Sequence, residues 1–192
     1  IYMFTSNPFA ELSSWLSPSI MQGYITLMII LVVAGTIFDV LHKKSARYFS
    51  ENMRKQKASA TRTVGGGEMV SNAVKTALVD VAASGEFCNQ TRRIAHLLTM
   101  YGFVAFALST AVMIYAYPTA TTTPAIWPLL WHIGALMVCI GGYWFWFFIR
   151  VDVRSEGKPA LRVMKADLFV LSLLGSATFA LIWSWLQSSG NV

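Results

Sequence analysis

The chain has 192 residues, enough for one compact domain or a small set of membrane spans but not for several domains. Apolar residues make up 55% of it and charged residues 12%, with a mean hydropathy of +0.53. A soluble domain carries about 25% charged residues, so the composition excludes a soluble domain as well as a disordered chain and a coiled coil. It indicates an integral membrane protein, and we expect a single membrane domain over residues 1–192.

Positive charge is confined to two parts of the chain. All fifteen lysines and arginines lie in the blocks Lys43 to Arg93 and Arg150 to Lys165. Cytoplasmic loops of membrane proteins are enriched in these residues, so we expect both blocks in the cytoplasm and the protein in a bacterial inner (cytoplasmic) membrane. The net charge of +6 would suggest a nucleic-acid partner in a soluble protein, but this distribution of the charge predicts none. A basic cytoplasmic face suits membrane lipid or an acidic soluble partner.

Four apolar stretches are long enough to cross a bilayer, which takes roughly 20 helical residues. They cover about 22–42, 94–117, 126–149 and 167–187. With both basic blocks inside, the sequence predicts an all-α fold, a four-helix transmembrane bundle with both termini on the outer (periplasmic) side. Residues 1–20, which hold Pro8, Trp15 and Pro18, predict an arm on the outer surface.

The basic cytoplasmic loop 43–93 is the one sizeable segment outside the spans. Its basic run, Lys43 to Lys57, is expected to continue the first helix, and Gly65 to Gly67 to form a hinge. Apolar residues then recur at helical spacing and predict one amphipathic helix over about 68–84. Such a helix either lies along the membrane surface or docks a partner protein. Its apolar face consists of Val70, Val74, Ala77, Leu78 and Val81.

Each of the three histidines lies within or at the edge of a span, where ionisable side chains are functional candidates. His42 closes the first span and His96 opens the second, so the topology places both at the cytoplasmic edge. Two imidazoles on facing helices are the axial ligands of a b-type haem, whose propionates Arg92 and Arg93 could pair with. The sequence thus predicts His42 and His96 as metal ligands of haem b; the alternative is that both anchor helix ends among lipid head groups.

His132 lies about two turns inside the outer boundary of the third span. Ala135, Cys139 and Gly142 follow on the same helix face, and such small residues let a flat group or another helix approach closely. Three roles stay open for the imidazole: a ligand of a second haem, a hydrogen bond to a quinone carbonyl, or a hydrogen bond to a neighbouring helix.

Asp39 is the carboxylate well inside a span, a costly position that calls for a reason. We expect it to orient the His42 imidazole or to relay protons to a reduced quinone. Asp39 and His132 are therefore the candidates for quinone or proton steps. The alternative for Asp39 is a salt bridge with Lys43, Arg93 or Lys165.

Two features mark the inner ends of the last two spans. The aromatic run Tyr143 to Phe148, which ends at Arg150, either walls a quinone or haem pocket or forms an interfacial belt. Asp167 opens the fourth span, where a carboxylate suits a helix N-terminus.

His42, the run Arg92-Arg93-Ile94-Ala95-His96 and the pair Trp131-His132 resemble motifs of small cytochrome b-like membrane subunits. That group includes the gamma subunit of respiratory nitrate reductase and the membrane subunits of heterodisulfide-reductase-like and Qmo-type complexes. A more specific resemblance is to the membrane anchor that accompanies dissimilatory adenylylsulfate reductase. The similarity covers roughly Asp39 to Lys165. The gamma group holds two haems with two pairs of histidines, which three histidines cannot supply, so the haem-ligand role carries over to His42 and His96 alone.

The resemblance implies a membrane anchor subunit of a redox complex. It would pass electrons between the quinone pool and a soluble cytoplasmic redox protein or other membrane subunits, through haem b and in a hetero-oligomer. The chain would then be at most an electron-transfer subunit of an oxidoreductase. The alternative is a cofactor-free accessory subunit that stabilises a larger membrane enzyme, which the small residues Ser172, Gly175 and Ser176 fit equally well.

Overall fold

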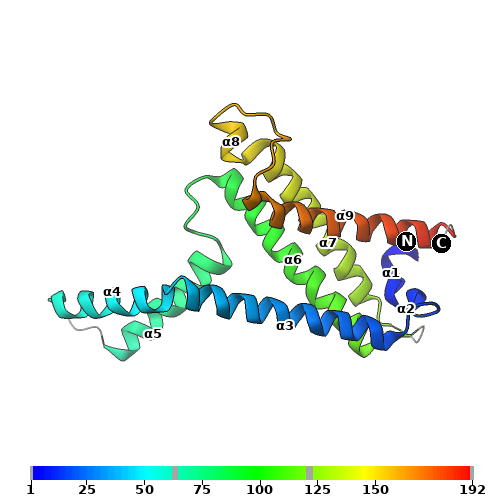
Figure 1. Ribbon diagram of the computed structural model, residues 1–192, viewed down its shortest axis with the longest axis horizontal. Coiled ribbons are helices and arrows are strands. Elements are labelled where there is room, and N and C mark those ends of the chain that lie inside the picture. The colour runs from blue at the N-terminus through cyan, green and yellow to red at the C-terminus, as the bar shows by residue number, and fades with distance from the viewer. Residues whose placement is uncertain (1, 62–64, 120–122, 191–192) are drawn as a thin grey trace.

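The computed structural model describes residues 2–61, 65–119 and 123–190, and every regular element in these ranges is helical. Within them, four helices are long and apolar enough to cross a membrane (Figure 1). The predicted spans are thus confirmed, with ends that differ by no more than four residues, and the chain is a multi-pass membrane protein. The spans are Pro18–His42, Gln90–Ala116, Ile126–Ile149 and Lys165–Ser188.

The first span, α3 (Pro18–His42), starts with Pro18, whose fixed φ suits the first helical position. It is followed by α4 (Ser45–Ser59), which carries the basic run. Between them Lys44 has a φ of +53°, in the left-handed region. The basic run is therefore a separate helix and not a continuation of the first span, because the left-handed residue interrupts the helical hydrogen bonds.

The predicted amphipathic helix forms as α5 (Gly66–Lys75), which continues into the π-helix η1 (Thr76–Ala82). The second span, α6 (Gln90–Ala116), starts at Asn89, whose side chain accepts hydrogen bonds from the N–H groups of Thr91 and Arg92 at 2.9 and 3.3 Å. An asparagine at this position satisfies N–H groups that have no partner inside the helix.

The third span consists of α7 (Ile126–Trp144) and the π-helix η2 (Phe145–Ile149). The short helix α8 (Val151–Arg154) and an irregular segment with turns lead to the 3-10 turn η3 (Lys165–Asp167) and to the fourth span, α9 (Leu168–Ser188).

Helices α6 and α7 pack with their backbones in contact. A Cβ atom added to Gly134 would lie 2.6 Å from the Phe106 nitrogen, and one added to Gly102 would lie 2.9 Å from the Gly134 oxygen. Only glycine permits such an approach, which is typical of helices that associate within lipid. Against the other side of α7 packs α9, through a buried cluster that includes Ala135, Val138 and Leu174.

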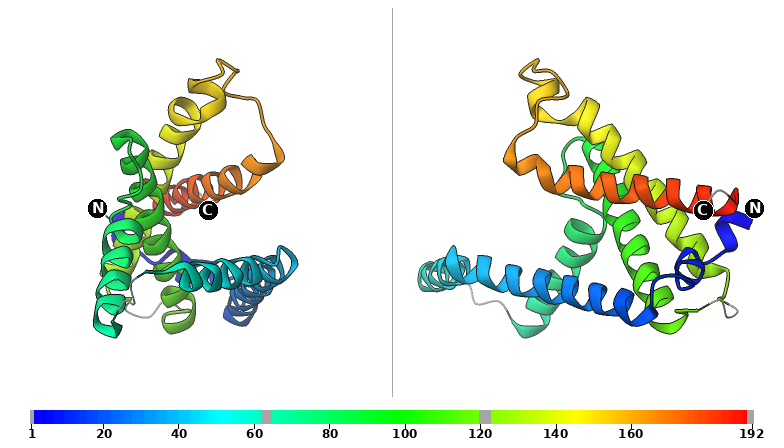
Figure 2. Two further views of the ribbon diagram at one scale, coloured as in Figure 1. Left: turned by 90° about the vertical axis from the view of Figure 1, so that its left-hand side faces the viewer. Right: turned by 45° about the vertical axis from the view of Figure 1, so that its right-hand side comes forward.

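In the described part of the chain, the hydrogen bonds of helix α3 to the other spans lie near its beginning. Gln22 Nε2 donates to the Ile114 carbonyl at 3.1 Å, and the Thr26 and Tyr115 hydroxyls lie 2.5 Å apart. From Leu27 to His42 every side chain is exposed, and Figures 1 and 2 show α3 running away from α6 and α7. The packed unit thus has three spans, with α3 attached at one end. Because lipid is as apolar as α3, no hydrophobic force drives this helix onto its neighbours.

The N-terminal arm contains α1 (Tyr2–Thr5) and α2 (Pro8–Leu12). Asn7 Nδ2 donates to the Tyr117 carbonyl at the end of α6 at 3.0 Å, and Gln187 Nε2 on α9 donates to the Pro8 carbonyl at 3.2 Å. The Phe9 ring meets the edge of Trp131 on α7, with centroids 5.8 Å apart. The arm therefore joins the ends of three helices, and both ends of the chain lie on the same side of the molecule (Figure 1).

Candidate functional site

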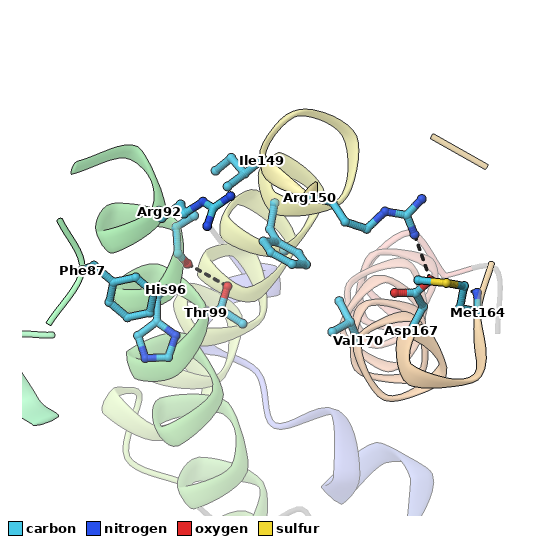
Figure 3. A pocket seen from close by; sticks show the side chains of 12 residues that line it. Phe87, Arg92, His96, Thr99, Ile149, Arg150, Met164, Asp167 and Val170 are labelled. Atoms are coloured by element: carbon cyan, nitrogen blue, oxygen red, sulfur yellow. Dashed lines mark hydrogen bonds and ion pairs between the residues drawn. The ribbon is translucent and has the colours of Figure 1, made fainter. Parts of the chain in front are cut away.

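A cavity of about 420 Å³ lies at the opposite end of the packed helices, where α6 begins, η2 ends and α9 begins (Figure 3). Its volume is in the range of small-molecule sites. Most of its wall is apolar, and a few polar side chains face it from three different elements. The lining residues are Phe87, Arg92, Ala95, His96, Thr99, Gly142, Phe145, Ile149, Arg150, Met164, Asp167 and Val170.

His96 lies in the α6 wall of this cavity. Its ring packs against Phe87, with centroids 5.0 Å apart, and neither ring nitrogen has a hydrogen-bond partner among the described residues. Arg92 precedes it by one turn in the same wall, and Thr99, one turn later, donates its hydroxyl to the Ala95 carbonyl at 2.9 Å. The structure thus brings together His96 and Arg92, two of the residues predicted to bind a cofactor.

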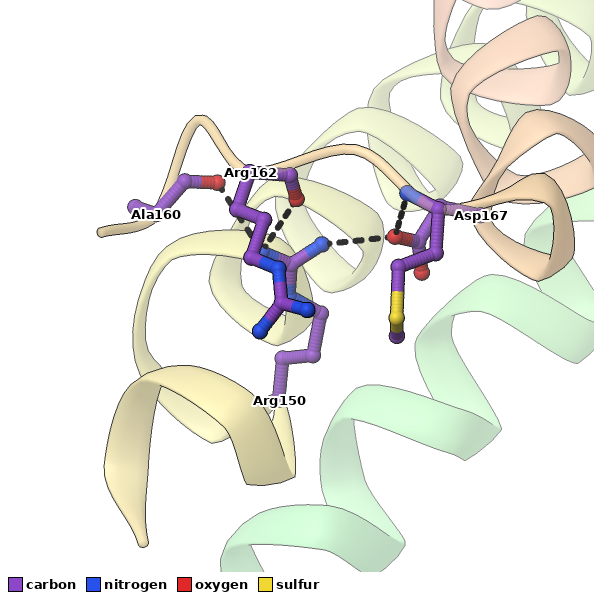
Figure 4. Close-up of polar contacts among 5 residues, drawn as sticks. Arg150, Ala160, Arg162 and Asp167 are labelled. Carbon is purple, nitrogen blue, oxygen red and sulfur yellow. Dashed lines mark hydrogen bonds and ion pairs between the residues drawn. The ribbon is translucent and has the colours of Figure 1, made fainter. Parts of the chain in front are cut away.

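Arg150 and Asp167 close the cavity from the other side. Arg150 Nη1 donates to Asp167 Oδ2 at 2.9 Å, and Nη2 donates to the carbonyls of Ala160 and Arg162 at 3.1 and 2.9 Å (Figure 4). The same carboxylate oxygen accepts the Met164 N–H at 2.9 Å. One buried guanidinium therefore fixes the whole connection between the third and fourth spans.

Arg150 also retains an unused donor. Only 5% of the residue is exposed, its guanidinium stacks 4.0 Å above the Trp146 ring, and its buried Nε has no hydrogen-bond partner within the described ranges. A buried donor without a partner is costly, and this one belongs to a residue that lines the cavity.

Arg150 and Asp167 line the cavity, although the sequence indicates only that they lie at span ends. Their signal was an arginine that ends an aromatic span, followed by an aspartate that opens the next one. The residues of the aromatic run lie in three different environments. Phe145 lines the cavity, Trp146 is buried in the core, and Phe148 is 68% exposed.

The other predicted residues of the haem site lie elsewhere. His42 stacks on Phe38 of its own helix, with centroids 5.5 Å apart, and is not among the residues that line the cavity. Asp39 pairs with Lys43 at 2.8 Å on the exposed surface of α3, which is one of the salt bridges expected as its alternative role. Arg93 donates its Nε to the Ala83 carbonyl at 2.8 Å.

His132 is fully buried between α7 and α9. Nδ1 lies 2.7 Å from the Pro128 carbonyl and Nε2 lies 2.7 Å from the Ser184 hydroxyl on α9. A carbonyl can only accept, so Nδ1 carries the proton and Nε2 accepts from Ser184. Of its three possible roles, the structure supports the hydrogen bond to a neighbouring helix. The small residues on its face serve the same contact, since a Cβ on Gly142 would lie 2.4 Å from Leu174 of α9.

A second, apolar groove of about 730 Å³ lies on the side of the N-terminal arm. It is lined mainly by aromatic and aliphatic side chains, among them Phe9, Trp131, Phe179 and Trp183. Three tryptophans line it, and the indole N–H of Trp131 already donates to the Thr110 hydroxyl at 3.0 Å. No charged side chain lines this groove among the described residues, whereas Arg92, His96 and Arg150 line the cavity at the other end.

Known proteins give no further guide to the site. No protein-family model, no curated protein and no solved structure matches the chain.

Proposed function

We propose that the chain is a membrane subunit of a redox complex and that the cavity beside His96 binds the head group of a quinone. The observation that carries the proposal is the exposed His96 imidazole, which has no hydrogen-bond partner among the described residues, in a mostly apolar cavity at the end of the spans. Such a site combines a place for a flat apolar ring with a group that can hydrogen-bond its oxygen atoms.

The lining suits a quinone chemically. Phe87 and Phe145 supply apolar walls for the ring, while His96 and Arg92 supply donors for carbonyl oxygens. Donors held in a mostly apolar site are stronger than the same donors in water. The cavity also lies where the spans end, so a long apolar tail can remain in the bilayer.

The reduction of a quinone takes up two electrons and two protons. A reduced soluble redox protein bound at the basic face would supply the electrons and be oxidised. His96 would bind one carbonyl oxygen, transfer a proton to it and recover that proton from water at the mouth of the cavity, while the second carbonyl oxygen would take its proton directly from that water. Arg92 and Arg150 would stabilise the negative charge that develops on oxygen when electrons arrive before protons.

The cavity does not by itself fit a haem held by two histidines. Its lining contains one imidazole, that of His96, while His42 stacks on Phe38 of α3. We therefore derive no step through a haem, and the pairing of His42 with His96 stays a prediction.

His42 provides a matched control for a binding experiment, because the sequence predicts both histidines at the cytoplasmic edge of the membrane. A short-tailed quinone is titrated into the protein in lipid nanodiscs, and binding is followed by tryptophan fluorescence. His96→Ala should weaken binding about tenfold, the value of one lost hydrogen bond, while His42→Ala should leave it unchanged. Equal losses in both variants, or no saturable binding by the unmodified chain, would contradict the proposal.

A second candidate function, a cofactor-free accessory subunit, is favoured by a different observation. Ser172 and Ser176 are exposed on α9, and a Cβ on Gly175 between them would meet nothing within 4 Å. Small residues of this kind let another helix approach, and α3 also leaves its apolar surface uncovered. If this candidate is right, Gly175→Leu will leave the isolated chain folded but shift its native-gel mobility in source membranes from a larger complex to the free chain.

A further inference from the structure

The end of η1 is attached to the flank of α6. Tyr101 on α6 donates its hydroxyl to the Ala82 carbonyl at 2.7 Å, and Arg93 Nε donates to the Ala83 carbonyl at 2.8 Å. Ser84, with a φ of +51°, then reverses the chain, and the Gly85 N–H bonds back to the Val79 carbonyl at 2.8 Å. These bonds fix the level of α5 and η1 relative to the second span.

That level lies within the membrane boundary. Tyr101 follows the first residue of α6, Gln90, by about 16 Å along the axis at 1.5 Å per residue. The whole of α6 is about 40 Å long, some 10 Å more than a hydrocarbon core of about 30 Å. Divided equally between the two ends, this excess places the Tyr101 Cα atom about 11 Å inside the core. Because the side chain of a helical tyrosine points back toward the N-terminus, the Tyr101 hydroxyl and the Ala82 carbonyl bound to it lie closer to the boundary, near the depth of about 5–10 Å at which surface helices enter a bilayer.

The side chains of α5 and η1 are divided between two faces. Apolar residues one turn apart are more than half exposed: Val70 by 61%, Val74 by 51%, Leu78 by 62% and Val81 by 63%. The opposite face carries polar residues such as Asn72 and Lys75. An apolar face of this size is unfavourable in water, and none of the described elements covers it.

The surroundings favour lipid over a protein partner as the cover. On α6, which is long and apolar enough to cross the membrane, Ile94 and Tyr101 are 45% and 46% exposed, and Tyr101 is bonded to the end of η1, so side chains that can face lipid lie beside this helix. Basic residues outnumber acidic ones by ten to four in 43–93, which suits phosphate groups at the lipid surface.

We propose that α5 and η1 form a membrane-surface helix, which lies in the bilayer boundary beside α6 with Val70, Val74, Leu78 and Val81 among the acyl chains. This inference is independent of the quinone proposal, because it rests on the contacts of Ala82 and Ala83 and on exposed side chains outside the cavity. It also limits the partner-docking surface of the basic loop to α4 and to the polar face of α5.

Nitroxide accessibility distinguishes this arrangement from the alternatives. Val74→Cys and Leu78→Cys report on the apolar face and Asn72→Cys on the polar face, each with Cys88→Ser and Cys139→Ala to leave one labelling site. The labelled chain is placed in nanodiscs of phosphatidylcholine and phosphatidylglycerol. Collisions with oxygen, which dissolves in lipid, are compared with collisions with a water-soluble nickel chelate.

At Val74 and Leu78 we expect oxygen collisions to exceed chelate collisions several-fold, and at Asn72 we expect the reverse. Equal chelate accessibility at all three positions would place the helix in water and overturn the proposal. Protection of Val74 and Leu78 from both reagents would also overturn it, because it would mean that protein covers the apolar face.

Discussion

Arg150 at the end of the third span and Asp167 at the start of the fourth form a buried ion pair, with an Nη1–Oδ2 distance of 2.9 Å and side chains only 6% and 13% exposed. The guanidinium is also bonded to two carbonyls of the connecting segment, so its charge is well compensated. Removal of one partner from such a pair leaves an uncompensated buried charge. The relationship links the stability of the fold to the shape of the cavity.

Arg150→Met should lower the free energy of unfolding by about 3–5 kcal/mol, because the Asp167 carboxylate would remain in a buried site without its partner. Unfolding of the protein in mixed micelles by a denaturing detergent, followed by tryptophan fluorescence, measures the change. Lys43→Met is the matched control, since the pair of Lys43 with Asp39 is exposed and worth about 0–1 kcal/mol. If Arg150→Met and Lys43→Met lowered the free energy of unfolding by similar amounts, burial of the Arg150–Asp167 pair would not increase its contribution to stability.

Ser184→Ala should destabilise the chain by about 1–2 kcal/mol, because the buried Nε2 of His132 loses its donor. His132→Phe removes the other partner, and the double variant should show a coupling energy of roughly 0.5–2 kcal/mol, as for other hydrogen bonds between membrane helices. The affinity for quinone should not change in any of these variants. A variant that loses quinone binding without losing stability would instead give His132 a role in the quinone step.

Gly134→Ala should impair folding or cost roughly 1–3 kcal/mol, because its new methyl group would collide with backbone atoms of α6 that cannot move aside. Gly175→Ala provides the control in another span, where a Cβ meets nothing within 4 Å. There the added methyl should be neutral or slightly stabilising, since alanine is the better helix former. If both variants unfold alike, the close contact between α6 and α7 is not present in the membrane.

The spans could be predicted from the sequence because length and hydropathy alone determine whether a helix can cross a bilayer. The packing of the spans against one another could not be predicted from the sequence. Nothing in the apolar pattern of α3 distinguishes a helix inside a bundle from one in lipid, because both environments are equally apolar. The left-handed Lys44 was likewise invisible in a run of good helix formers.

The lining of the cavity could be predicted in part. The sequence indicates His96 and Arg92 as candidates because ionisable side chains at a span edge require an explanation, and both line the cavity. The hydrogen-bond partners of the buried side chains could not be predicted, because periodicity indicates which face of a helix is apolar but not which helix packs against it. Ser184, the partner of His132, lies 52 residues later in the chain, and Asp167, the partner of Arg150, lies 17 residues later. His42 and His96 share a predicted depth, yet depth alone does not bring two helices together.

Photolabelling by a quinone locates its binding site directly. An azidoquinone is illuminated with the protein in nanodiscs, and the modified residues are mapped by mass spectrometry with and without excess unlabelled quinone. We expect competable labels on residues that line the cavity, within 87–99 on the α6 side and 142–150 on the α7 side. Labels confined to the groove around Trp131 and Trp183, or labels that excess quinone does not suppress, would contradict a quinone site beside His96.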